Sequence, residues 1–155
     1  GGGAADARPN FAGDWVLEEV EGDCDAFLVD MQQARYVRYM AKMLKYGLGK
    51  VALRCAQFGD DLVFTKTMAD PRQIGDVTAR ICVGAGPVEL QDEIGKITVQ
   101  TTRWEGETLY LRCLAEDTKL EVSKRMFVDA AGRFSEEMTS CKGTSIKYHF
   151  RRKQC

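Results

Sequence analysis

The spacing of hydrophobic residues divides the chain into one helical stretch and a long series of short strands. The helical stretch covers residues 25–49 and follows Asp23, a residue type suited to N-capping a helix. Its apolar residues recur on one face in two successive pieces: Phe27, Leu28 and Met31 in the first, and Ala34, Val37, Ala41 and Leu44 in the second. The pattern predicts two short helices joined by a turn, with Gly47 or Gly49 as the C-terminal stop.

From residue 51 onward, the chain shows the period of β-strands. Val51, Leu53 and Cys55 alternate with Ala52 and Arg54, and clusters of Gly, Asp and Pro separate this segment from the later ones. Together with residues 10–22, ten such segments occur at intervals of about 8–12 residues. We therefore predict an all-β fold over residues 10–153: a ten-stranded antiparallel up-and-down β-barrel capped by a short helix-turn-helix, because closure removes exposed edges. Residues 1–9 are expected to form a flexible N-terminal tail.

Composition and charge narrow the functional classes. The 155 residues are 45% hydrophobic and 29% charged, which is typical of a folded domain, and the net charge of −1 argues against nucleic acid as a partner. No apolar run approaches 18 residues, so no transmembrane helix is predicted. The segment "GGGAADARPN" lacks the features of a signal peptide. We expect a cytoplasmic protein, with a processed secreted form as the open alternative.

The residues suited to metal binding or catalysis are scattered. The six cysteines contain no C-x-x-C pair, so no zinc site is expected; they are Cys24, Cys55, Cys82, Cys113, Cys141 and Cys155. Six reduced thiols are favoured over three disulfides, since a chain of this length does not need covalent cross-links. His149 is the single histidine and has no nucleophile or carboxylate at motif spacing. Neither an enzymatic activity nor a metal or cofactor is therefore predicted.

Several short motifs, in a fixed order, resemble one known family. Phe11, Gly13 and Trp15 form an F-x-G-x-W pattern ahead of the helical stretch, "GDDLVFTKT" forms a hairpin at 59–67, and "CVGAGPVELQDE" and "GKITVQTTRWEGETLYLRC" follow. "KRMFVDAAGRFSEEMT" and "SIKYHFRRK" resemble the last three strands of that family. Over residues 10–153 the chain resembles the intracellular lipid-binding proteins, which include fatty-acid-binding and cellular retinoid-binding proteins. Secreted lipocalins share a G-x-W near the start but place their helix near the C-terminus, and are the structural alternative.

The resemblance implies a β-clam with an internal cavity that a lipid-like ligand enters near the helices. Members that bind acids hold the carboxylate with an Arg on the eighth strand, matched by Arg125 or, with a shifted alignment, by Arg112. Their R-x-Y motif is missing from the last strand. There, either Tyr148 and Phe150 or Lys147 and His149 face inward, and the first is favoured because exposing large apolar groups costs about 1.5–3 kcal/mol each. The predicted ligand-binding residues are Trp15, Phe27, Leu28, Val37, Met40, Arg112, Arg125, Tyr148 and Phe150.

Two further hypotheses concern surfaces and partners. The polar side of the second helix carries a basic face that either docks on anionic membranes or is simply solvated: Arg35, Arg38, Lys42 and Lys45. The leading function is non-enzymatic carriage of a fatty acid or similar hydrophobic ligand by a monomer. The alternative is an interaction module, in which a barrel with a filled lumen binds a protein partner. A secreted lipocalin-like carrier is the third.

Overall fold

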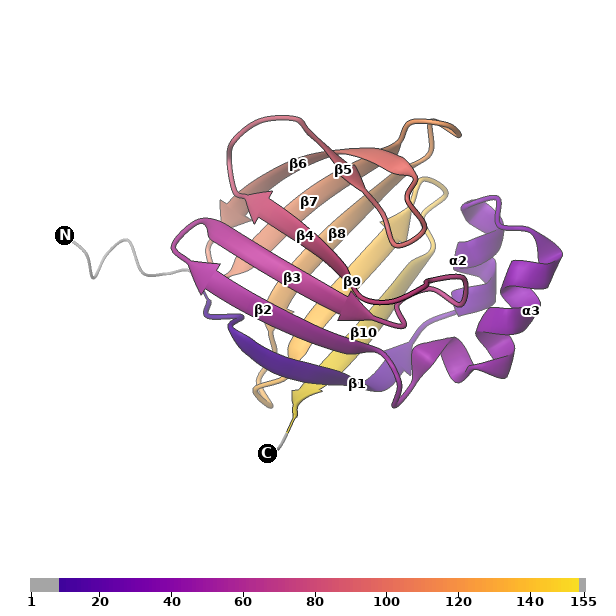
Figure 1. The fold of residues 1–155 in the computed structure, drawn as a ribbon, viewed down its shortest axis with the longest axis horizontal. Coiled ribbons are helices and arrows are strands. Elements are labelled where there is room, and N and C mark those ends of the chain that lie inside the picture. Colours follow the sequence, from indigo (N-terminus) through magenta and orange to yellow (C-terminus); the bar gives the residue numbers. More distant parts are fainter. Residues whose placement is uncertain (1–8, 154–155) are drawn as a thin grey trace.

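The computed structural model describes residues 9–153, so the tail expected at 1–9 lies almost wholly outside the described residues, as does Cys155. Ten antiparallel strands form one sheet that curls into a barrel, with two helices at one end (Figure 1). The strands are β1 (Gly13–Glu21), β2 (Ala52–Phe58), β3 (Asp61–Thr67), β4 (Val77–Cys82), β5 (Val88–Gln91), β6 (Ile97–Glu105), β7 (Thr108–Ala115), β8 (Glu121–Val128), β9 (Phe134–Ser140) and β10 (Ser145–Arg152). The predicted fold class is confirmed.

The order of the strands follows the chain, apart from one closure. Each strand pairs with its neighbours in sequence except at β4 and β5, and β1 pairs with both β2 and β10, which joins the first strand to the last. The two edges of the sheet are β4 and β5, which do not pair with each other. Hollows of about 390 and 300 Å³ lie along this gap. The barrel is therefore nearly, but not fully, closed by hydrogen bonds.

The half of the barrel away from the helices is filled by aromatic side chains, which we call the aromatic floor: Phe11, Trp15, Phe64, Phe134 and Phe150. All five are at most 4% exposed. The Phe134 ring lies 5.0 Å from that of Phe11 and 5.8 Å from that of Phe150, centroid to centroid. The indole nitrogen of Trp15 donates to the carbonyl of Phe11 at 2.9 Å, so the polar edge of this buried ring is satisfied.

The two predicted helices lie over the opposite end of the barrel. They are α2 (Cys24–Asp30) and α3 (Arg35–Met43), followed by a single 3-10 turn, η1 (Lys45–Gly47). The expected N-cap is present, because the Asp23 carboxylate accepts a hydrogen bond from the amide of Ala26 at 3.0 Å. The second helix ends at Met43, before the expected glycine stop. A second apolar cluster, the cap cluster, joins the helices to the barrel through Cys24, Phe27, Val122 and Ile146.

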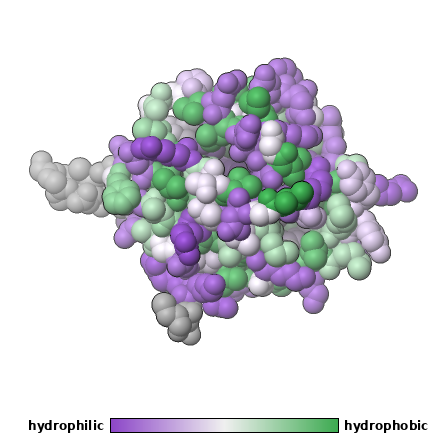
Figure 2. Space-filling view, viewed as in Figure 1, coloured by the Kyte–Doolittle hydropathy of each residue, from purple (hydrophilic) through white to green (hydrophobic). Residues whose placement is uncertain are grey.

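Gly22 makes the connection between β1 and α2. Its φ of +98° lies in a region that side chains disfavour, and an added Cβ would approach the carbonyl oxygen of Ser145 to 2.6 Å. A glycine is thus required where the first strand turns into the cap. Within the described part of the chain, neither helix has the length and apolar character needed to cross a membrane. Over the face that carries β2 to β5, hydrophobic and hydrophilic residues are interspersed (Figure 2).

Candidate functional site

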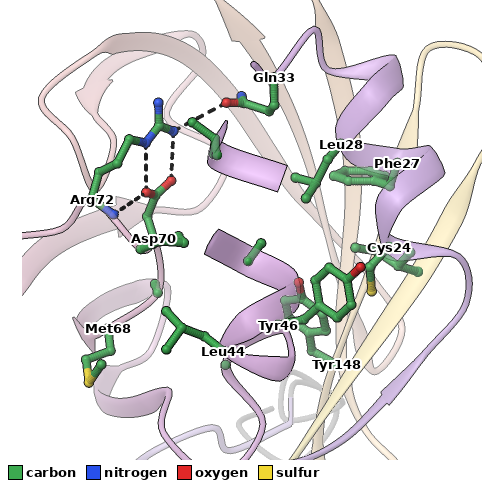
Figure 3. Close-up of a pocket in the computed structure, with 16 residues that line it drawn as sticks. Cys24, Phe27, Leu28, Gln33, Leu44, Tyr46, Met68, Asp70, Arg72 and Tyr148 are labelled. Atoms are coloured by element: carbon green, nitrogen blue, oxygen red, sulfur yellow. Dashed lines mark hydrogen bonds and ion pairs between the residues drawn. The ribbon is translucent and has the colours of Figure 1, made fainter. Parts of the chain in front are cut away.

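A cavity of about 130 Å³ lies between the helices and the mouth of the barrel (Figure 3). Its walls come from α2, α3, the β3–β4 loop and the start of β10, and its apolar lining is Phe27, Leu28, Val37, Leu44, Met68, Ile146 and Tyr148. The helices are positioned over it because their apolar faces, found in the sequence at helical spacing, have no other surface on which to be buried. The cavity is therefore a consequence of the same pattern that predicts the cap.

Side-chain hydrogen bonds attach α2 firmly to the barrel. The carboxylate of Asp30 accepts hydrogen bonds from the hydroxyls of Ser140 and Thr144, each at 2.6 Å, at the β9–β10 turn. The bond from Ser140, followed by the bond from Thr144, contributes most to lowering the pKa of Asp30 below its ordinary value. The first helix is thus fixed at its C-terminal end as well as by its buried face.

The second helix is attached less extensively. Val37 and Ala41 are buried and line the cavity, and Arg38 pairs with Asp25 of α2 at 3.3 Å. Across the mouth, Arg72 of the β3–β4 loop forms a two-point ion pair with Asp70 at 3.0 Å for each bond, and its guanidinium reaches Gln33 between the helices at 3.4 Å (Figure 3). The loop is therefore connected to the helices across the mouth by one long hydrogen bond, from Arg72 to Gln33.

The inner end of the cavity carries neutral hydroxyl and thiol groups. Burial raises the pKa of Tyr148 well above its ordinary value and that of Cys24 to about 11, and it also raises the pKa of Tyr46. All three groups stay protonated at neutral pH. This end of the cavity offers hydrogen-bond donors without charge.

Four of the nine residues predicted to bind a ligand line this cavity: Phe27, Leu28, Val37 and Tyr148. Trp15 and Phe150 face inward but belong to the aromatic floor, where they are 1% and 4% exposed. The favoured inward orientation of Tyr148 and Phe150 agrees with their packing in the interior clusters. Met40 is half-buried on α3 and does not line the cavity.

The inward orientation predicted for Arg125 and Arg112 is wrong. Arg125 has a side chain 48% exposed and pairs with Glu137 at 3.6 Å, while Arg112 is 62% exposed and pairs with Glu121 at 2.8 Å. The reason is strand parity: buried Val122 and Met126 fix the even positions of β8 as inward-facing. The inward cation on this strand is Lys124, which sequence reasoning missed although it stands between those two apolar residues.

The predicted basic face is only partly exposed. Arg35, Lys42 and Lys45 are exposed, but the Arg38 side chain is 25% exposed and is held by Asp25, and its Nε is buried without a hydrogen-bond partner. Lys45 lies in η1 and not in the helix. On the same helix Tyr36, Tyr39 and Met43 are exposed by 63%, 64% and 66%.

His149 has partners that its sequence neighbourhood does not reveal. Its Nδ1 lies 2.6 Å from the Ser135 hydroxyl and its Nε2 lies 2.9 Å from the Glu21 carboxylate. Glu19, Glu21 and His149 also bring potential metal ligands within 4.8 Å of one another, but Glu19 accepts a bond from Arg133 at 2.7 Å. Ser135 is fully buried, so this serine cannot reach a substrate as a nucleophile. The group is a network that joins β1, β9 and β10.

Comparison with known proteins connects this fold to lipid transporters. Neither the protein-family models nor the curated proteins contain a match to the sequence. Among solved structures, the REP1-NXSQ fatty acid transporter aligns with a TM-score of 0.73 over 93% of this chain and 96% of that one, at 13% identity. A tyrosine-to-phenylalanine mutant of that transporter aligns with a TM-score of 0.72 over 92% of this chain and 97% of its own, at 14% identity. This chain shares the overall fold of these two structures.

Proposed function

We propose that the protein binds a fatty acid or a similar single-chain hydrophobic molecule reversibly, and carries it without chemical change. One observation carries the proposal: an apolar cavity lies under the helical cap and reaches Ile146 and Tyr148 on the inner side of the barrel. Ligand sites are concave, largely apolar and equipped with few polar groups, and this cavity has that character. The fatty acid transporters with the same fold support the ligand class.

Entry of such a ligand requires movement of the cap. The cavity of about 130 Å³ is smaller than the roughly 300–1,000 Å³ of sites for small molecules. The better-attached helix is α2, and the contact between Arg72 and Gln33 at 3.4 Å is a weak link across the mouth. We therefore assign the opening movement to α3 and the β3–β4 loop, which enlarge the cavity as they separate.

Contact with an anionic membrane is part of the same proposal. Tyr36, Tyr39 and Met43 recur at helical spacing on the exposed side of α3, with Arg35 and Lys42 beside them. Aromatic and apolar side chains enter the lipid interface while basic ones meet anionic head groups. A surface of this kind next to the entrance allows a ligand to pass directly between membrane and cavity.

The second candidate function is an interaction module that binds a protein. The aromatic floor favours it, because half of the lumen is filled by side chains and is closed to a ligand. The cap cavity favours the carrier instead. The two candidates differ in whether the purified protein takes up a hydrophobic molecule at all.

A binding titration with a fluorescent fatty acid and matched variants tests the proposal. Leu28→Trp fills the cavity, whereas Val29→Trp places the same bulk on the neighbouring residue, which is 48% exposed. We expect a fluorescent long-chain fatty acid to bind the wild type and Val29→Trp with one-to-one stoichiometry and to lose at least 10-fold in affinity for Leu28→Trp. Native mass spectrometry of the purified protein detects a ligand retained from the cell. No saturable binding to the wild type would refute the carrier and favour the interaction module.

A further inference from the structure

Four charged side chains form a layer across the barrel, between the cap cluster and the aromatic floor. Lys66 on β3, Lys124 on β8 and Glu136 on β9 each stand opposite a buried apolar residue of the adjacent strand. Glu93 reaches the same layer from the β5–β6 connection. Their side chains keep 10–25% of their surface accessible, so the layer is not completely enclosed by protein.

Lys66 and Glu93 already satisfy each other. The Lys66 ammonium donates a hydrogen bond to the Glu93 carboxylate at 3.1 Å, linking β3 to the far side of the gap between β4 and β5. The charge of Lys66, with a smaller contribution from Lys124, lowers the pKa of Glu93 to about 2. This ion pair is therefore complete without a ligand.

The other two face each other without a hydrogen bond. The Lys124 Nζ and the Glu136 Oε1 are 4.0 Å apart, and within the described residues neither side chain has a hydrogen-bond partner. Burial lowers the pKa of Lys124, but Cys113, Glu136, Glu93 and Asp92 together raise it above its ordinary value, so the ammonium persists. An ammonium offers three donors and a carboxylate only accepts. The interior thus contains a donor and an acceptor at a fixed separation.

We propose that Lys124 and Glu136 form a subsite for the hydroxyl group of a neutral single-chain lipid, of the long-chain alcohol class. The inference rests on the proposed function and specifies its ligand. A hydroxyl oxygen placed about 2.8 Å from both atoms spans their separation with an angle of roughly 90° at the oxygen. It accepts a hydrogen bond from the ammonium and donates one to the carboxylate. One neutral group therefore makes a hydrogen bond with each of the two residues.

An ionised fatty acid fits this layer less well. The two lysines and two glutamates sum to zero charge, so a carboxylate would add an unbalanced negative charge in a poorly hydrated interior. It could accept from Lys124, but it has no proton to donate to Glu136. Charge balance and hydrogen-bond polarity therefore both favour the alcohol.

The subsite lies beside the inner end of the cap cavity. Glu136 lies directly across from Tyr148 on the adjacent strand, and Tyr148 forms the inner end of that cavity. Ile146 also lines the cavity and is two residues closer to the cap, a rise of about 7 Å. A lipid with its hydroxyl at the charged layer would extend its chain past these two residues to the helices.

Displacement of the neutral dye Nile red by three twelve-carbon lipids tests the subsite. Dodecan-1-ol donates and accepts, 1-methoxydodecane only accepts, and dodecanoate is an anion at pH 7.4. We expect dodecan-1-ol to compete at least 10-fold more strongly than either of the others. Lowering the pH toward 5 should strengthen binding of the acid, whose protonated form carries a hydroxyl, and leave the alcohol unchanged.

Two adjacent pairs of residues provide the variants and their controls. Glu136→Gln gives the interior a net positive charge, and we expect it to raise the affinity for dodecanoate at least 10-fold. Lys124→Met should reduce the affinity for dodecan-1-ol at least 10-fold. Glu137→Gln and Arg125→Met change the neighbouring side chains, which are on the outer face, and should leave all three affinities within twofold.

The outcomes separate the subsite from the carrier function. Binding of all three lipids with equal strength, or strongest binding of dodecanoate to the wild type, would overturn the subsite and leave the carrier in place. An unchanged preference in Glu136→Gln would do the same. If that variant fails to fold, the wild-type order of affinities and its pH dependence decide. Failure of every lipid and of the dye to bind would overturn the carrier function and the subsite together.

Discussion

Replacing Phe134 by alanine tests whether the lower half of the barrel is a packed core or a space that a ligand can reach. Phe134 is fully buried at the centre of the aromatic floor. Its ring has four aromatic neighbours at centroid distances between 5.0 and 6.1 Å: Phe11, Trp15, Phe64 and Phe150. Trp15, Phe64 and Phe150 are anchored on β1, β3 and β10, and Phe11 lies just before β1, so the rings cannot easily close over the space left by a truncated side chain.

The structure places the expected loss in the middle of the range known for such truncations. Truncation of a buried Phe to Ala costs about 3–5 kcal/mol, and an aromatic pair contributes about 0.5–1.5 kcal/mol, part of which is already in that figure. We expect Phe134→Ala to lose about 4 kcal/mol of unfolding free energy. Phe134→Leu retains more volume and should lose about 1–2 kcal/mol. Phe58→Ala, at a position 78% exposed, should stay within about 0.5 kcal/mol.

Urea unfolding followed by tryptophan fluorescence and circular dichroism measures these differences. The midpoint should fall in Phe134→Ala while the denaturant slope stays constant, since the folded and unfolded surfaces change little. Phe134→Leu should bind the fluorescent fatty acid as the wild type does, because the cap cavity lies above the floor. A loss below about 1.5 kcal/mol in Phe134→Ala, or altered ligand binding in Phe134→Leu, would show that the floor is part of the ligand space.

Three further predictions concern the interior charge, the cap and one turn. Glu93→Gln should remove about 1–3 kcal/mol of stability at pH 7. In the wild type this contribution is present above the unfolded pKa of about 4.3 and is lost as the pH falls through the folded pKa of about 2. The urea midpoints of the two proteins should therefore converge below about pH 2. Equal wild-type and variant midpoints at pH 7 would contradict the pairing with Lys66. Asp30→Ala should speed amide hydrogen exchange in α2 more than in the barrel strands, because it removes both bonds to the β9–β10 turn; unchanged exchange would argue against this attachment. Gly22→Ala should lose more than about 2 kcal/mol in urea unfolding, against about 1 kcal/mol for Gly143→Ala, whose added Cβ meets open space, and equal losses would refute the steric argument.

The strand and helix pattern could be predicted from sequence because each element expresses a local period. The alternation from Val51 to Cys55 and the helical spacing of Phe27 and Val37 reflect which side faces the interior, and neither depends on distant residues. Asp23 was found for the same reason, since an N-cap acts within three residues. The sequence was sufficient wherever the determining contact was short in range.

The prediction of Arg125 as a lumen residue is wrong because it gives the residue type more weight than the alternation of inward and outward side chains along the strand. The family resemblance favours an arginine on β8 and so points to Arg125. Apolar Val122 and Met126, however, show that the even-numbered positions of this strand face inward. The same alternation, read without an expected residue type, identifies Lys124. Glu136 on β9 is inward-facing by the same rule, because it stands opposite buried Met126 while its neighbour Glu137 faces the other side.

Other features depend on closure of the barrel and have no local signal. Lys66 and Glu93 are separated by 27 positions and meet only because β3 and the β5–β6 connection approach across the unpaired edges. Arg38 was expected on an exposed basic face, but the angle between the two helices brings it to Asp25. Such pairs follow from how elements pack, and the periods of the individual elements do not determine that packing.

The aromatic floor and the charged layer have different roles in the interior of the barrel. The aromatic floor is buried, packed and anchored on several strands, so it supplies stability, and under the proposed function it bounds the ligand space from below. The charged layer above it is costly to bury and would be poorly justified as a stabilising device, because an apolar replacement of a buried ion pair is often neutral or stabilising. Lys66 and Glu93 at least satisfy each other, whereas Lys124 and Glu136 remain 4.0 Å apart without a hydrogen bond. An inward-facing ion pair that makes no hydrogen bond is better explained by a polar group that arrives with a ligand than by the stability of the empty barrel.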